Sequence, residues 1–316
     1  MDELTRRDWL RLTLAAGAGL ALTPADLWAQ GKLMTRPIPS TGEQLPVIGL
    51  GSSATFSQVA RQEDVSALKS VLQALLDGGA TLFDTAPSYG ASEEVAGRIV
   101  KDAGWGPRVF WATKLNVAGR GGSSADPAAA RAQVEASFQR VGKAKIDLIQ
   151  VHNLGDPATQ LPILQALKKQ GRIRYVGITT TFDQQYDELV RIMRNEPLDF
   201  IGIDYAIDGR EVEQTILPLA QEKKIAVLAY APFGRTRLFR RVADRPLPDW
   251  AAEIDAKSWA QVFLKWIIGH PAITAVTPAT SQAKNMLDNL GGGIGRLPNQ
   301  DLRTRMAAYI DALPGA

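Results

Sequence analysis

Residues 147–177, DLIQVHNLGDPATQLPILQALKKQGRIRYVG, decide the fold class of this chain. Two short runs of apolar and β-branched residues, Asp147–Val151 and Ile173–Gly177, predict buried strands. The segment between them has helical periodicity and is ended by Gly171. A strand, a helix and a second strand in this order form the unit of a parallel sheet, so the sequence predicts an α/β fold.

The same alternation of strand and helix runs along most of the chain. Further strands are expected at Val47–Leu50, Thr81–Phe83, Val109–Thr113, Phe200–Asp204, Ala226–Tyr230 and Ile273–Val276. Helices are expected at Asp64–Asp77, Pro127–Val141, Asp183–Arg194, Glu211–Lys223 and Ser258–Ile268. Eight strands with helices between them match the count of a (β/α)8 TIM barrel, which is the predicted fold.

Two segments stand outside this repeat. Lys32–Pro39 and Gln44–Ile48, separated by a polar turn, predict an N-terminal β-hairpin that could plug the floor of the barrel. Arg235–Asp255 contains Pro and Arg and has weak periodicity, so we expect a long loop after strand 7. Long loops in barrel proteins are often functional.

The N-terminus resembles a twin-arginine (Tat) signal peptide. Arg6 and Arg7 precede Trp9, and an apolar stretch of 11 residues follows from Leu12 to Leu22. A membrane-spanning helix needs roughly 20 apolar residues, so no permanent anchor is expected. We therefore predict a signal peptide over residues 1–29, one barrel domain over residues 30–316, and a periplasmic or otherwise exported protein. An ordinary amphipathic helix is the alternative.

The composition excludes several classes of site. The 316 residues include no cysteine and two histidines, which rules out disulfides and thiolate nucleophiles and disfavours a metal site. The formal net charge is only +3, and the basic residues are scattered, so nucleic-acid binding is not indicated. A hydrophobic content of 45% suffices for one large core.

Polar side chains directly follow three of the predicted strands: Asp84, Lys114 and His152. Catalytic groups of (β/α)8 barrels lie at the carboxyl ends of the strands, and neighbouring strands lie about 4.8 Å apart. These three side chains, together with Tyr89 on the loop after Asp84, are therefore expected to converge. The alternative interpretation is a buried ion pair beside a core tyrosine and a core histidine.

Six segments carry a resemblance to the aldo-keto reductases, in the order in which they occur in that family. They are residues 83–90 FDTAPSYG, 112–114 ATK, 147–153 DLIQVHN, 171–178 GRIRYVGI, 229–234 AYAPFG and 277–289 TPATSQAKNMLDN. The resemblance implies an NADPH-dependent oxidoreductase that reduces an aldehyde or ketone to an alcohol.

The resemblance also assigns roles to the four converging residues. Tyr89 would donate a proton to the developing alkoxide, and the Lys114 cation would lower the pKa of this phenol. Asp84 would hold Lys114 by its charge. His152 would donate a hydrogen bond to the substrate oxygen or share in proton transfer.

The resemblance implies NADPH as cofactor, with NADH less favoured, and no metal. Tyr230 would stack on the nicotinamide, Lys284 would contact the 2′-phosphate, and Asn289 would contact the adenine. The whole expected cofactor set is Asn153, Thr179, Thr180, Tyr230, Pro232, Phe233, Gly234, Thr280, Lys284, Asp288 and Asn289.

The sequence departs from the family pattern in the carboxamide site and near the phosphates. Thr179-Thr180 replaces a common Ser-Asn pair, Gly202 replaces a glutamine, and Ala279 replaces a lysine that some members have. These departures predict weaker cofactor binding.

Two alternatives to a reductase remain open at this point. One is a redox-sensing or regulatory subunit that binds the nicotinamide cofactor with slow or no turnover, similar to the potassium-channel β-subunits. The other is a ligand-binding barrel that has lost its cofactor. A monomer is the expected state, with a small carbonyl compound as substrate and the Tat export machinery as partner of the precursor. Phe56 and Phe233 are candidate pocket walls, whereas Trp111 and His270 are expected to be structural.

Overall fold

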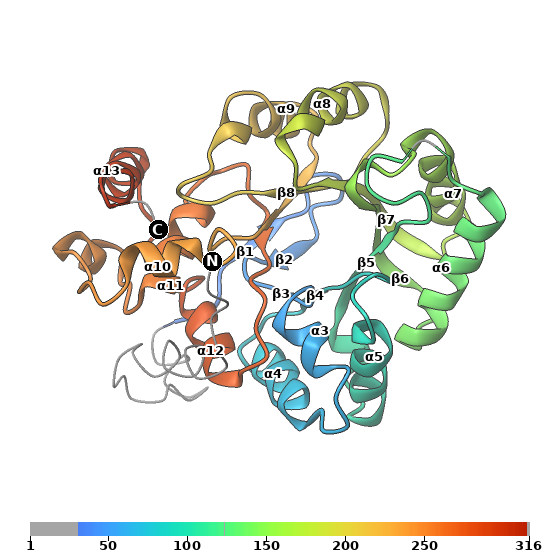
Figure 1. Cartoon of the computed structure of the whole chain (residues 1–316), viewed down its shortest axis with the longest axis horizontal. Helices are drawn as coiled ribbons and strands as arrows, with labels where there is room; N and C mark the ends of the chain where they lie inside the picture. The colour runs from blue at the N-terminus through green and yellow to red at the C-terminus, as the bar shows by residue number, and fades with distance from the viewer. Residues whose placement is uncertain (1–30, 123, 315–316) are drawn as a thin grey trace, which may run out of the picture.

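A computed structural model describes residues 31–122 and 124–314 of the chain, so the predicted signal peptide lies outside the described residues. One parallel sheet of eight strands forms the centre of the molecule, in sequential order from β3 to β10. Isolated parallel bridges from Ile48 to Val276 and from Gly51 to Ala279 join the first strand to the last and close the barrel. The predicted (β/α)8 fold is confirmed (Figure 1).

The strands follow the predicted positions closely. Their bounds are β3 Leu50–Gly51, β4 Leu82–Asp84, β5 Phe110–Leu115, β6 Ile146–Val151, β7 Ile173–Thr180, β8 Phe200–Asp204, β9 Ala226–Tyr230 and β10 Ala275–Val276.

Helices form an outer ring around the sheet (Figure 1). Between the strands lie α3 Thr55–Val59, α4 Ser66–Asp77, α5 Ser92–Asp102, α6 Pro127–Val141, α7 Pro157–Lys169, α8 Tyr186–Asn195, α9 Ile216–Glu222, α10 Arg237–Val242 and α11 Trp259–Ile268. After β10 come α12 Ala283–Gly291 and α13 Gln300–Asp311.

Local signals explain several helix ends. The Asp126 side chain accepts a hydrogen bond from the amide of Ala128, and Pro127 occupies the first turn of α6. Gly142 ends the same helix with φ of 70°, in the left-handed region that favours glycine. Asp156 and Ser258 cap α7 and α11 in the same way as Asp126 caps α6.

The N-terminal hairpin closes the floor of the barrel, as the sequence predicts. Its strands are β1 Thr35–Pro37 and β2 Gln44–Pro46, which pair antiparallel. Ile38 and Leu45 of the hairpin are 0% and 1% exposed and pack among the side chains that fill the barrel interior. Fully burying one such side chain contributes about 1.5–3 kcal/mol, so the hairpin is an integral part of the core.

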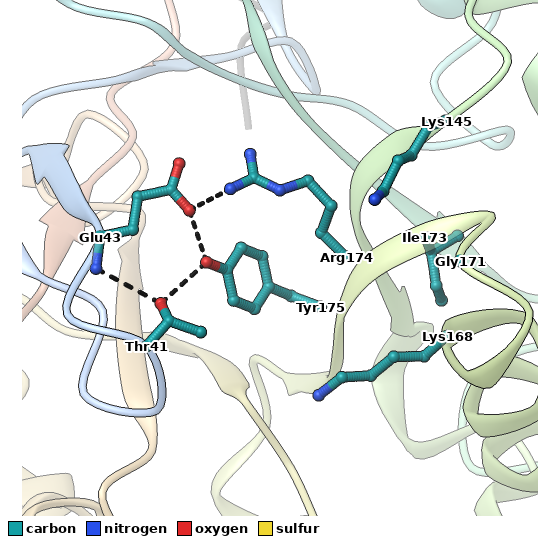
Figure 2. A pocket seen from close by; sticks show the side chains of 8 residues that line it. All are labelled: Thr41, Glu43, Lys145, Lys168, Gly171, Ile173, Arg174 and Tyr175. Carbon is teal, nitrogen blue, oxygen red and sulfur yellow. Dashed lines mark hydrogen bonds and ion pairs between the residues drawn. The ribbon is translucent and has the colours of Figure 1, made fainter.

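Beside this hairpin is a surface hollow of roughly 530 Å³ at the amino ends of the strands (Figure 2). The Tyr175 hydroxyl and the Arg174 guanidinium both bind the carboxylate of Glu43 there. This hollow lies at the opposite end of the barrel from the predicted catalytic residues, which follow the carboxyl ends of the strands.

The segment after β9 differs from the predicted loop, because it contains α10 and a short 3-10 helix at Asp249–Ile254. Arg237 in α10 forms two hydrogen bonds, of 2.7 and 2.8 Å, to the carboxylate of Asp208 in the preceding βα loop. A helix of six residues is not stable on its own, so contacts with distant residues hold it in place.

In the described part of the chain, no helix combines the length and apolar character required to cross a membrane.

Candidate active site

The structure brings the four predicted catalytic side chains together at the carboxyl end of the barrel. Asp84 ends β4, Lys114 lies near the end of β5, and His152 follows β6 directly. The Lys114 Nζ lies 2.7 Å from the Asp84 Oδ2 and 5.0 Å from the centre of the Tyr89 ring. The Tyr89 and His152 rings meet edge to face, with centroids 5.8 Å apart.

The ion pair between Lys114 and Asp84 is buried, with side-chain exposures of 1% and 5%. Lys114 also donates a 2.9 Å hydrogen bond to the carbonyl of Thr85. Buried charges are costly unless they are paired and hydrogen-bonded. Burial acts to lower the pKa of Lys114, but the negative charge of Asp84 opposes it and the pKa is raised, so the ammonium stays charged.

The pKa of Tyr89 is raised above its ordinary value. The sequence alone predicts that the Lys114 cation lowers it. Burial is the largest cause, and the positive charge of Lys114 opposes it without cancelling it. The phenol is therefore protonated at neutral pH. A protonated Tyr89 is a proton source for an alkoxide, which is a much stronger base than a phenolate.

The imidazole of His152 is neutral. Burial lowers its pKa to about 3, and the charges of Lys114 and Arg120 act in the same direction. A neutral ring in this position acts as a hydrogen-bonding group and is not an acid at neutral pH. Of the two roles that the sequence left open for His152, the structure favours hydrogen bonding.

A second tyrosine joins this cluster from β9. The Tyr230 hydroxyl donates to the Asp84 Oδ1 at 3.2 Å and accepts from the Gln150 Nε2 at 3.0 Å. The Lys114 Nζ lies 5.3 Å from the centre of the Tyr230 ring. Gln150 was not among the site residues predicted from the sequence. This residue lies on β6, two positions before His152, and alternate residues of a strand point to the same face of a sheet.

The backbone is strained in the loops above this cluster. Asn153, Leu154 and Asp156 after β6 have φ of 53°, 50° and 39°. Ala231 and Arg235 after β9 have φ of 47° and 50°. Non-glycine residues in the left-handed region are concentrated at functional sites, where surrounding contacts hold them.

The predicted carboxamide residues lie beside His152. The backbone amide of Asn153 donates a 3.0 Å hydrogen bond to the Thr179 Oγ1. The Thr180 hydroxyl donates to the Gln185 Oε1 at 2.5 Å, and Thr180 is 0% exposed. Both threonine side chains therefore hold loops in place, and their contact with a cofactor stays a prediction.

The loop after β9 begins at Ala231, directly after Tyr230. Pro232 is buried, Phe233 is partly buried, and Gly234 has φ of 54°. The Phe233 ring packs on Phe239 with centroids 4.8 Å apart. By contrast, Phe56 is 0% exposed and packs on Phe83, so the expectation that it walls a pocket is wrong.

The remaining predicted cofactor residues lie in α12 or just before it. The Thr280 hydroxyl accepts a 3.1 Å hydrogen bond from the Gln282 amide at the start of this helix. Lys284 in the first turn is exposed and forms no ion pair with any described residue. Asp288 binds Ser258 and Gln261 at 2.8 Å each and joins α12 to α11. Asn289 is 4% exposed.

Trp111 and His270, which the sequence predicts to be structural, pack against or bond to other parts of the protein. Trp111 is 0% exposed and meets Phe83 edge to face. The His270 Nδ1 accepts a 3.2 Å hydrogen bond from the Ala272 amide.

Comparison with known proteins agrees with this arrangement. The aldo-keto reductase YhdN of Bacillus subtilis (strain 168) is 32% identical over 216 residues, which are 66% of this chain and 64% of that protein. The match to this relative thus spans slightly less than two thirds of its length. The methylglyoxal reductase YeaE of Escherichia coli (strain K12) is 28% identical over 245 residues, which are 76% of this chain and 82% of that protein.

Solved structures share the fold. An aldo-keto reductase from Bacillus halodurans in its holo form has a TM-score of 0.70 at 21% identity, covering 88% of this chain and 96% of that one. An aldo-keto reductase from Klebsiella pneumoniae, solved in complex with NADPH, has a TM-score of 0.70 at 22% identity, covering 85% and 92%. The model of the Aldo/keto reductase family matches residues 47–309. Because this match covers most of the described barrel, the chain belongs to the aldo/keto reductase family of oxidoreductases.

Proposed function

We propose that this protein reduces an aldehyde or ketone to an alcohol with NADPH, and that Tyr89 is the proton donor. The observation that carries the proposal is the position of the Lys114 Nζ, 2.7 Å from the Asp84 Oδ2 and 5.0 Å from the centre of the Tyr89 ring. A bound nicotinamide would supply the hydride.

The chain's own residues would stabilise the charge that develops on the substrate oxygen. Tyr89 holds its proton at neutral pH and would release it to the alkoxide. Lys114 would stabilise the phenolate that remains, because a nearby cation favours the ionised phenol. The neutral His152 would donate a hydrogen bond to the same oxygen.

The residues expected to hold the cofactor fit a dinucleotide in their chemistry. Lys284 is exposed in the first turn of α12, where backbone amides and a cation that pairs with no described carboxylate favour a phosphate. Its ammonium is a point charge, so we expect weaker directional binding of the 2′-phosphate than an arginine would give. The two threonines that end β7 already form hydrogen bonds within the protein, which supports modest affinity for the cofactor.

A fluorescence titration with NADPH and NADH, followed by an assay of NADPH oxidation with small aldehydes and ketones, tests this function. We expect binding of both nucleotides, tighter binding of NADPH, and turnover with at least one carbonyl compound. Binding without turnover would favour a regulatory barrel instead. Absence of binding would favour a barrel that has lost its cofactor.

We further propose that the protein is exported through the twin-arginine route and acts outside the cytoplasm as a monomer. The motif Arg6-Arg7 with a short apolar stretch supports the export route, whereas the monomeric state is carried over from the family resemblance. Cell fractionation of the wild type and of an Arg6→Lys, Arg7→Lys variant tests it, because the variant should stay in the cytoplasm. Equal distribution of the two proteins would contradict the export proposal.

A further inference from the structure

Two tyrosines lie beside the ammonium of Lys114, and the proposed reaction uses only one of them. The ring centres of Tyr89 and Tyr230 lie 5.0 and 5.3 Å from the Lys114 Nζ. Tyr89 lies on the loop after β4, whereas Tyr230 ends β9 and packs against the side chains that fill the barrel. The second phenol therefore needs a separate explanation.

The Tyr230 hydroxyl belongs to a chain of directed hydrogen bonds. The Gln150 Nε2 donates to this hydroxyl at 3.0 Å, and the hydroxyl donates to the Asp84 Oδ1 at 3.2 Å. Lys114 binds the other carboxylate oxygen of Asp84 at 2.7 Å. Burial raises the pKa of Tyr230 well above its ordinary value, so the phenol keeps the proton that it donates.

Gly202 supplies the space in which this ring lies. A Cβ atom at position 202 would come within 2.4 Å of the Tyr230 Cε2 and 2.6 Å of its hydroxyl oxygen. Gly202 does not have a positive φ, so its backbone does not require glycine. Glycine is required here because the Tyr230 ring lies directly against the Cα of residue 202. Any larger side chain at this position would displace the ring.

We propose that Tyr230 is a positioning residue of the active site and that Gly202 makes its position possible. Tyr230 holds one oxygen of Asp84, which turns the other oxygen toward Lys114 and keeps Lys114 directed at Tyr89. This role rests on the proposed reductase function. It concerns the hydroxyl of Tyr230 and is separate from any contact between its ring and the nicotinamide.

The first experiment compares Tyr230→Phe with the wild type in NADPH-dependent carbonyl reduction over a range of pH. Loss of a hydrogen bond to a charged group should lower kcat on the order of tenfold, with nucleotide affinity nearly unchanged. The acid limb of the kcat profile should move to higher pH by roughly one unit. The reason is that the lost donor raises the pKa of Asp84, and a protonated Asp84 no longer holds Lys114.

Tyr175→Phe is the matched control. The Tyr175 hydroxyl also binds a carboxylate, that of Glu43, but it does so at the floor of the same barrel. Tyr175→Phe should leave the acid limb in place. A shift of equal size in both variants would show a general effect of removing a buried hydroxyl and would overturn the proposal.

Gly202→Ala tests the space that the Tyr230 ring occupies without removing the Tyr230 hydroxyl. We expect it to move the acid limb in the same direction as Tyr230→Phe, because the displaced ring loses its contact with Asp84. The double variant should show a smaller effect than the sum of the two single ones, as expected for residues in contact. Full additivity would overturn the proposal. If Gly202→Ala does not fold, the comparison of Tyr230→Phe with Tyr175→Phe decides alone.

Failure of this proposal is distinguishable from failure of the proposed function. If none of the tested carbonyl compounds supports NADPH oxidation by the wild type, the proposed function is overturned, and the positioning role of Tyr230 with it. An active wild type whose acid limb is unchanged in Tyr230→Phe would overturn the positioning role alone.

Discussion

Arg235 and Asp204 form an ion pair across the mouth of the barrel, with 2.5 Å between the Arg235 guanidinium and the Asp204 Oδ2. Asp204 ends β8, and Arg235 lies in the loop after β9. The Asp204 Oδ1 is buried and has no hydrogen-bond partner among the described residues. The negative charge of Asp204 is also one of the causes that raise the pKa of Tyr89, so this carboxylate acts on the proposed proton donor.

The first prediction concerns this charge. Asp204→Asn should lower the pKa of Tyr89, because it removes a negative charge that disfavours the phenolate. The alkaline limb of the kcat/KM profile should therefore move to lower pH. Asp208→Asn is the matched control, since Asp208 also pairs with an arginine, Arg237, and is not among the groups that shift the pKa of Tyr89 most. An alkaline limb that moves upward in Asp204→Asn would contradict the prediction.

The second prediction concerns the proton donor. Tyr89→Phe keeps the ring beside His152 and removes the acidic proton, so carbonyl reduction should be lost with NADPH affinity almost unchanged. Steady-state kinetics and fluorescence titration of the same preparation measure the two effects. Retained turnover would remove Tyr89 from the mechanism.

The third prediction concerns the buried ion pair. Lys114→Met leaves the carboxylate of Asp84 buried without its cation, which should lower the free energy of unfolding by about 3–5 kcal/mol. Urea denaturation measures this loss. Adding Asp84→Asn should restore part of the stability, because the unpaired charge is then absent. A double variant less stable than Lys114→Met alone would contradict this account.

The fourth prediction concerns the pH dependence of stability that His152 contributes. Its pKa is about 3 in the folded state, below the value of about 6.5 for a free imidazole. The unfolded chain therefore binds the proton more readily, and this contribution is lost as pH falls from about 6.5 toward 3. His152→Gln should weaken the pH dependence of the melting temperature in this window. An identical pH dependence in both proteins would mean that His152 titrates normally.

The fifth prediction concerns cofactor choice. Lys284→Met should weaken the binding of NADPH more than that of NADH, because only NADPH carries the 2′-phosphate that this exposed cation would contact. Lys257→Met is the comparison, since Lys257 is an exposed lysine on the segment before α11. Equal losses for both nucleotides in Lys284→Met would exclude a contact with the 2′-phosphate.

The sequence by itself determined the barrel and the members of the site. Apolar strands that end in Asp84, Lys114 and His152 predicted both, because strand and helix periodicity are local and the carboxyl ends of parallel strands meet at one edge. The hairpin that fills the barrel floor was also predictable from its turn and its flanking strands.

Only the tertiary structure decided the protonation of that site and the partners of its side chains. Burial outweighs the charge of Lys114 at Tyr89, and it makes His152 neutral. The bond from Tyr230 to Asp84 and the space at Gly202 join residues far apart in the chain. Desolvation and close approach depend on what surrounds a group in three dimensions, and no local pattern of residues records them.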